Sequence, residues 1–399
     1  MSTAYIVDIL RTPVGKFGGT LSTVRPDDMA ALVMREIVAR NPNLDPALIE
    51  DVVMGAANQA GEDNRNVARM ALLLAGLPQE IGGVTVNRLC ASGLQAIIDA
   101  GRAITCGDGD VYLAGGVESM TRAPFVMAKA EAAFSRSAEI YDTTIGWRFT
   151  NPALAKLHYP FGMGETAENV AERYGISRET QDEFAHQSQV KYKAAAEAGK
   201  FRDEIVPVRI PQRKGEDIVF DTDEHPRLSS VEKLSSLSPA FKKEGSVTAG
   251  NSSGINDGAA VSIIVSEEVL KRYNLTPIAR IVSAAVAGVD PAHMGMGPVP
   301  ATRKALQRAG LSINDIGLAE INEAFAAQAV PCVQQLEINP EIVNVNGGSI
   351  AIGHPLGASG TRISATLLHE MKRRDNVKYG LATMCVGVGQ GAAVIYEKV

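Results

Sequence analysis

Short apolar runs alternate with amphipathic stretches along the first 120 residues. Apolar and β-branched runs bounded by turn residues predict buried strands, and apolar residues spaced three and four apart predict helices. The predicted strands are Ala4–Ile9, Asp51–Met54, Val84–Asn87 and Asp110–Ala114, and the predicted helices lie near Asp27–Arg40, Asn64–Ala75 and Gly93–Thr105. Strands and helices that alternate in this way are typical of α/β folds with buried central strands.

The same order of elements returns in the last third of the chain. LDPALIEDVVMGAANQA, starting at Leu44, resembles LSINDIGLAEINEAFAA, starting at Leu311, at an offset of 267 (311 − 44). The same offset carries the ASG of Ala91–Gly93 onto the ASG of Ala358–Gly360. Ordered matches at a nearly constant offset indicate that the chain contains two copies of one domain.

Residues 121–250, between the two copies, differ in composition. They contain the only tryptophan, Trp147, and many charged residues, and they predict one clear helix over Arg178–Ala198 after the N-cap Ser177. Their apolar residues are too many for a flexible linker. We therefore expect an insertion that folds over the duplicated core.

Composition narrows the classes of function. A chain of 399 residues is long enough for two or three domains, and its net charge of −6 argues against nucleic acid or an anionic membrane as the main partner. No apolar stretch approaches the roughly 18 residues of a membrane span, and no targeting segment is recognisable. The four cysteines form no CxxC pair and the six histidines are scattered, so we expect no disulfide framework, no metal site and a reducing cytoplasm.

Two strand-to-helix loops carry candidate catalytic side chains. Cys90 precedes a predicted helix whose dipole and unpaired amides favour a thiolate, although a buried, inert cysteine is the alternative. Under the offset of 267, Gly357 matches Cys90, and His354 lies in the equivalent loop of the second copy. A local twofold would bring the loops together, so we expect His354 to activate Cys90.

A third candidate is Cys385 in CVGVGQG. A dinucleotide loop needs GxGxxG between a strand and a helix, whereas this GxGxG lies between two apolar runs and predicts a strand-to-strand connection. Its glycine amides could form an oxyanion hole beside a proton-transferring thiol, and a plain turn is the alternative. Asn322, in INEAF, could orient a water or a carbonyl, but asparagine at a strand end is also a common turn former.

Nine segments in order resemble the thiolases, specifically degradative 3-ketoacyl-CoA thiolases (acetyl-CoA acyltransferases). They are RTPVGKFGG, NRLCASGLQA, AGGVESM, MGETAENVA, SVTAGNSSGINDGAA, MGMGPVPA, INEAF, GGSIAIGHPLGASG and CVGVGQGAA. The resemblance implies an α/β thiolase fold of duplicated βαβαβαββ halves in a five-layered αβαβα core. It implies that residues 1–120 and 251–275 form the first half, that residues 276–399 form the second half, and that residues 121–250 form an inserted loop domain. A strand near Ala259–Val265 would complete the first half.

The resemblance also implies residue roles. Cys90 would be the nucleophile and Cys385 the general acid and base. His354 and Asn322 (through a water) would form one oxyanion hole, and the amides of Cys90 and Gly387 a second. The residues implied to bind substrate or CoA are Arg227, Ser253, Met163, Met294 and Phe325. Coenzyme A is the implied co-substrate, no cofactor is permanently bound, and a homodimer or homotetramer is expected.

The implied reaction is thiolysis of 3-ketoacyl-CoA to acyl-CoA and acetyl-CoA, in fatty-acid or aromatic-acid degradation. Gly162 replaces a histidine found in many thiolases, which disfavours a biosynthetic acetoacetyl-CoA thiolase. SAEIYDTTIGWRFTNP resembles degradative members including β-ketoadipyl-CoA thiolases, yet the sequence identifies no basic residue to hold a distal carboxylate. The second thiol argues against a ketoacyl synthase. A non-catalytic acyl-CoA or lipid binder and a Cys90/Cys385 redox sensor are the alternatives from other classes.

Overall fold

The computed structural model describes residues 2–399 and contains a large mixed sheet with helices on both faces. The strands are β1 (Ala4–Arg11), β2 (Gly15–Lys16), β3 (Asp51–Gly55), β4 (Gly82–Val86), β5 (Val111–Ser119), β6 (Phe125–Met127), β7 (Ile140–Asp142), β8 (Val208–Ile210), β9 (Ile218–Phe220), β10 (Asn256–Ser266), β11 (Ala279–Gly288), β12 (Ile316–Ile321), β13 (Tyr379–Val386) and β14 (Gln390–Lys398). The helices are α1 (Pro26–Arg40), α2 (Val67–Leu74), α3 (Ser92–Cys106), α4 (Pro152–Leu157), α5 (Met163–Tyr174), α6 (Arg178–Glu197), α7 (Val231–Ser235), α8 (Glu267–Arg272), α9 (Pro298–Ala309), α10 (Ala326–Leu336), α11 (Ser349–Ile352) and α12 (Leu356–Arg373).

The sheet joins the two copies of the repeat edge to edge. Its strand order is β12-β13-β14-β11-β1-β10-β5-β3-β4. β1 and β11 connect the halves through the pairs Tyr5–Arg280 and Ile6–Ala279. In the first half β10 runs antiparallel between β1 and β5, so the strand expected near Ala259–Val265 is confirmed.

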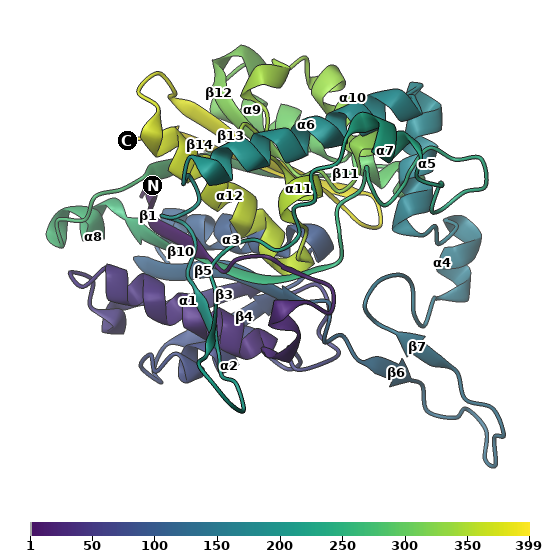
Figure 1. Ribbon diagram of the computed structural model, residues 1–399. Coiled ribbons are helices and arrows are strands. Elements are labelled where there is room, and N and C mark those ends of the chain that lie inside the picture. The colour runs from purple at the N-terminus through teal and green to yellow at the C-terminus, as the bar shows by residue number, and fades with distance from the viewer. Residues whose placement is uncertain (1) are drawn as a thin grey trace.

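The helices divide the fold into five layers (Figure 1). α1 and α2 pack on the outer face of the first half-sheet, and α9 and α10 on the outer face of the second. α3 and α12 contact each other and lie between the half-sheets, where their apolar side chains share one cluster with β1, β10, β13 and β14. The five-layered architecture implied by the sequence resemblance is therefore present.

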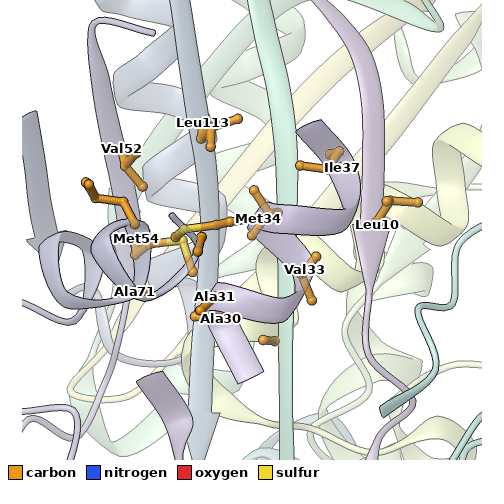
Figure 2. Packing of buried hydrophobic residues seen from close by; sticks show 14 of the residues in the cluster. Leu10, Ala30, Ala31, Val33, Met34, Ile37, Val52, Met54, Ala71 and Leu113 are labelled. Carbon is orange, nitrogen blue, oxygen red and sulfur yellow. The ribbon is translucent and has the colours of Figure 1, made fainter. Parts of the chain in front are cut away.

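The sequence pattern of α1 explains the outer layer. Pro26 occupies the first turn and two aspartates follow it, an arrangement that suits the donor-rich start of a helix. Ala30, Val33, Met34 and Ile37 recur at helical spacing and are fully buried. Figure 2 shows these side chains directed at the strands of the first half-sheet.

The central helices cross at glycines that the repeat places in equivalent positions. A Cβ at Gly93 would lie 2.7 Å from Thr361 Oγ1, and a Cβ at Gly360 would collide with Leu94. Gly93 and Gly360, like Leu94 and Thr361, are 267 residues apart. Reciprocal contacts between equivalent residues are what a local twofold produces, and they confirm the duplication.

The insertion contains β6 to β9 and α4 to α7. The predicted helix is α6, and Ser177 caps it by accepting a hydrogen bond from the amide of Thr180. α6 contacts α10 and α11 of the second half, whereas the β6–β7 hairpin projects away from the layers (Figure 1). The domain boundaries at 120/121 and 250/251 stay predictions.

Candidate active site

Cys90 lies on a short 3-10 turn, Leu89–Ala91, between β4 and α3. The preceding Leu89 has a left-handed backbone, with φ of +46°, and its amide donates a hydrogen bond of 2.8 Å to Asn87 Oδ1. Ser92 Oγ donates to the Leu89 carbonyl at 2.7 Å. A leucine in this region of backbone space is strained, and such strain persists where surrounding contacts hold a functional loop in place.

Burial raises the pKa of the Cys90 thiol to about 11, although the Gly387 amide donates a hydrogen bond to its sulfur. Burial therefore opposes the thiolate that the start of α3 favours. The amide donors at the start of α3 do not offset the loss of water around the charged form. This raised pKa favours the protonated thiol at neutral pH, so a nucleophilic role for Cys90 calls for a proton acceptor.

His354 and Asn322 come together in a buried network. Asn322 Nδ2 lies 3.4 Å from His354 Nε2. The Asn322 carbonyl oxygen accepts a 2.6 Å hydrogen bond from Ser349 Oγ, which in turn accepts one of 2.6 Å from Arg362. With its oxygen occupied, the Asn322 amide presents its donor side to His354, so the turn-former alternative does not describe its contacts.

The second ring nitrogen of His354 is held by Ser359. His354 Nδ1 lies 2.6 Å from Ser359 Oγ, which lies 2.8 Å from the Pro355 carbonyl oxygen. Because a hydroxyl has one hydrogen, its donation to Pro355 assigns the ring hydrogen to Nδ1 and leaves Nε2 as an acceptor. Burial, with the charge of Arg362 adding to it, lowers the pKa of His354 to about 3, so the ring is neutral.

Cys385 is the residue before the last of β13 and lies in an apolar cluster with Met294 and Phe325. Burial raises the pKa of Cys385 well above its usual value, and the negative charge of an ionised Cys90 raises it further. Cys332 raises it as well. Met163 packs against the same cluster.

CVGVGQG connects β13 to β14. Val388 and Gly389 both have positive φ, at +62° and +79°, in a connection of three residues between the paired Val386 and Gln390. The predicted strand-to-strand connection is confirmed. Arg88 ties the turn to the Cys90 loop, because its guanidinium donates to Gln390 Oε1 at 2.8 Å.

A cavity of about 370 Å³ opens at Cys90. Gly387 and Met163 share it, so the structure brings three predicted residues together in one space. The cavity is lined by Ala57, Asn58, Asn87, Leu89, Cys90, Glu118, Met120, Thr143, Thr144, Ile145, Gly146, Trp147, Arg148, Phe161, Gly162, Met163, Leu356, Gly387 and Val388. Leu356 follows His354 by two residues, which connects the cavity to the histidine loop.

The two residues expected to contact CoA lie apart from this cavity. Ser253 lies beside the INEAF segment, where both its amide and its hydroxyl donate to the Ala324 carbonyl at 3.0 Å. Arg227 lines a separate hollow with Lys16 and His225, and donates to His225 Nε2 at 2.9 Å. Their roles toward CoA stay predictions.

Glu118 and Arg148 are cavity residues that the sequence did not single out. Glu118 accepts backbone hydrogen bonds from Ala57, Asn58 and Gly357, and so joins the loop after β3 to the start of α12. Glu118 belongs to the AGGVESM segment, where an acid at the end of a buried strand was the available signal. No motif spacing in the sequence links Arg148, which lies in the insertion, to Cys90.

Within residues 2–399, no group of three or more His, Cys, Asp or Glu side chains could hold a metal ion. No helix in the same range has the length and apolarity needed to cross a membrane.

Comparisons with known proteins agree with this geometry. Family models match residues 4–268 (thiolase, N-terminal domain) and 275–398 (thiolase, C-terminal domain). A 3-oxoadipyl-CoA/3-oxo-5,6-dehydrosuberyl-CoA thiolase of Escherichia coli K12 is 56% identical over the full length of both chains. The Bacillus anthracis acetyl-CoA acetyltransferase has a TM-score of 0.94 at 43% identity, covering 100% of this chain and 99% of that one. Human mitochondrial 3-ketoacyl-CoA thiolase in complex with CoA has a TM-score of 0.92 at 40% identity, covering 100% and 98%. With both domains matched over nearly its whole length, this chain belongs to the thiolase family of acyltransferases.

Proposed function

We propose that the chain cleaves 3-ketoacyl-CoA with CoA to acyl-CoA and acetyl-CoA through an acyl group on Cys90. The observation that supports this best is that the glycine turn after Cys385 also contacts Cys90. The Gly387 amide donates to the Cys90 sulfur, and Cys385 lies two residues earlier, close enough for Cys90 to affect its pKa. One thiol can form the covalent bond while the other moves a proton.

The first step begins with a protonated Cys90. His354 Nε2, an acceptor in the tautomer that Ser359 holds, takes the thiol proton as the sulfur attacks the C3 carbonyl carbon. The C3 oxygen gains the negative charge, and the amides of Cys90 and Gly387 donate to it. One such donor is worth about 3–4 kcal/mol of barrier. The nearby oxyanion offsets the cost of a charged imidazole, whose pKa burial lowers.

Cys385 completes the cleavage. The C2–C3 bond breaks, its electron pair moves to C2, and the thioester oxygen of the enolate is stabilised by Asn322, through a water, with the His354 imidazolium. Cys385 donates its proton to C2 and releases acetyl-CoA. Its buried, apolar setting keeps the thiol protonated until the carbanion forms.

The second half-reaction restores both thiols. Incoming CoA gives its proton to the Cys385 thiolate, and the CoA sulfur attacks the acyl carbon on Cys90. Acyl-CoA leaves, and the Cys90 thiolate recovers its proton from His354. Two half-reactions through one covalent intermediate give ping-pong kinetics.

For the substrate we propose a dicarboxylic 3-oxoacyl-CoA, 3-oxoadipyl-CoA. The support is the E. coli relative whose name includes this compound and which is 56% identical over the full length. A β-ketoadipyl-CoA thiolase of Pseudomonas aeruginosa is 53% identical over 99% of both chains. Acetoacetyl-CoA synthesis is the second candidate, because an acetyl-CoA acetyltransferase of Syntrophomonas wolfei is 48% identical over 98% of both chains.

The test is thiolysis of 3-oxoadipyl-CoA by wild type and two variants. Cys90→Ala is expected to abolish turnover, because no other group can hold the acyl chain. Cys385→Ala is expected to lower kcat by at least 100-fold while CoA still binds, since it removes the proton donor and acceptor. Turnover by Cys90→Ala would show that the nucleophile is another residue. Equal loss of CoA binding in Cys385→Ala would assign that residue to binding.

A further inference from the structure

Arg148 is the cation of the Cys90 cavity. It lies in the insertion between β7 and α4 and is half-buried. Among the lining residues of the described chain, Glu118 and Arg148 are the two that carry formal charge at neutral pH when ionised. The rest of the wall is neutral, with Leu89, Trp147 and Phe161 among its apolar side chains.

The contacts of Arg148 leave its charge available. Its Nη2 donates to Asn58 Oδ1 at 3.1 Å, and this acceptor is a neutral amide. No carboxylate of residues 2–399 forms an ion pair with Arg148, whereas Arg122 and Arg25, outside the cavity, both pair with Glu62. A half-buried guanidinium with five donors and one neutral partner is suited to bind an anion.

Asn58 is itself fixed, so the guanidinium is held in place. Its Nδ2 donates to both the carbonyl oxygen and the hydroxyl of Thr143 at 3.1 Å, which turns Oδ1 toward Arg148. Its backbone amide donates to Glu118 at 3.1 Å. Asn58 is 9% exposed. A buried, oriented support of this kind keeps a binding group in one geometry.

Glu118, the cavity's carboxylate, does not neutralise this site. Its two oxygens accept three backbone amides, which direct the carboxylate to the chain. The cavity thus has the nucleophile Cys90, an apolar wall and a cation held by Asn58. A ligand that fits this arrangement has a carbonyl for the thiol, a short methylene chain and a terminal anion.

We propose that Arg148, positioned by Asn58, binds the distal carboxylate of a dicarboxylic 3-oxoacyl-CoA and makes the enzyme select such chains. The proposal rests on the proposed thiolysis and adds the residue that sets its substrate class. Arg227 lines a different hollow, so the two arginines are not alternatives for one anion. The sequence had indicated no basic residue for this carboxylate.

The experiment compares two substrates of equal chain length, 3-oxoadipyl-CoA and 3-oxohexanoyl-CoA, which differ in the terminal carboxylate. Wild type is expected to prefer 3-oxoadipyl-CoA in kcat/KM by at least tenfold, roughly the worth of one hydrogen-bonded charge pair. Arg148→Gln is expected to lower this ratio by at least tenfold. Arg148→Lys keeps the positive charge but lacks the planar guanidinium that can donate two parallel hydrogen bonds. Its preference for 3-oxoadipyl-CoA is expected to lie between those of wild type and Arg148→Gln.

Arg136→Gln is the matched control, because Arg136 is an exposed arginine of the same insertion and does not line the cavity. It is expected to keep the wild-type ratio. A wild type with no preference, or an Arg148→Gln variant with equal losses on both substrates, would overturn the proposal. An Arg148→Gln variant whose main change is a higher KM for CoA would assign the arginine to a CoA phosphate and would also overturn it. If wild type cleaved neither substrate, the proposed thiolysis itself would fail.

Discussion

Glu118 is buried between the loop after β3 and the start of α12, which follows the His354 loop. Its carboxylate accepts the amides of Ala57 and Asn58 from one half and that of Gly357 from the other. Burial is the main cause that raises the pKa of Glu118 from 4.5 to about 7, with the charge of Asp63 contributing. A residue that holds two loops together is thus close to its own titration at neutral pH.

The sign of the pH effect follows from this raised pKa. Between about pH 4.5 and pH 7 the folded chain holds a proton on Glu118 that the unfolded chain has lost. Its contribution to stability is complete below about pH 4.5 and is lost as the pH rises through about 7. Glu118→Gln has no proton to gain or lose. We therefore expect the unfolding free energy of wild type, minus that of Glu118→Gln, to increase by about 3 kcal/mol as the pH falls from about 8 to about 4.5.

Urea unfolding of the two proteins at each pH checks this prediction. A difference in unfolding free energy that stays constant with pH would mean that Glu118 titrates alike in the folded and unfolded chains.

The pKa values of single residues could not be predicted from the sequence. The position of Cys90 at a helix start favours a thiolate, yet burial against the core raises its pKa. The apolar side chains that pack against Cys90 come from distant parts of the chain. Arg148 illustrates the same limit, since only the folded insertion brings it to the cavity of Cys90.

At the scale of elements, the crossing of α3 and α12 sets the distance between the loops that carry Cys90 and His354. Gly93 lies in the first turn of α3, directly after the Cys90 loop. A Cβ there would lie 2.6 Å from the Gly357 carbonyl oxygen and 2.7 Å from Thr361 Oγ1, so the helices would have to separate. Gly93→Ala should therefore destabilise the protein by about 1–3 kcal/mol and lower kcat as well.

Gly288→Ala is the control for this variant, because the nearest atom to a Cβ at Gly288 is 3.9 Å away. Thermal unfolding and steady-state thiolysis of both variants provide the measurement. Equal stability of Gly93→Ala and wild type would show that the crossing can relax without cost.

The elements themselves followed closely from the hydrophobic pattern. The helix expected near Asn64–Ala75 begins at Val67, because Asn66 caps it by accepting from the Arg69 amide. β5 continues to Ser119, beyond the expected Ala114, as a strand buried on both faces between β3 and β10. The hydrophobic pattern predicts which segments are strands and helices, because burying one face requires apolar residues at the spacing of that element. It does not predict where each element ends, because the ends depend on capping residues and strand partners.

At the scale of the whole molecule, the two halves share one interior. Every side chain from Gly357 to Met371 in α12 is buried, against α3 and both half-sheets. The duplication predicted this architecture, because two equivalent strand-to-helix loops around a twofold must meet at its centre. The assembly of several chains, the cytoplasmic location and the domain boundaries stay predictions.

A shared interior predicts that the C-terminal half cannot fold alone. Residues 276–399 without the rest would expose the face of α12 that packs on α3 and β10, and so lose the burial that stabilises it. We expect this fragment to lack a cooperative thermal transition, and co-expression with residues 1–275 to restore one together with activity. A cooperative transition of the isolated fragment, measured by circular dichroism, would show that the halves are independent.

The acyl group on Cys90 is the central claim, and mass spectrometry of the intact protein tests it most directly. Wild type mixed with 3-oxoadipyl-CoA in the absence of free CoA, and then quenched in acid, is expected to gain the mass of one succinyl group. Peptide mapping is expected to place that group on Cys90, and Cys90→Ala to gain nothing. Active wild type that turns over without this adduct, or an adduct on Cys385 in its place, would contradict the account.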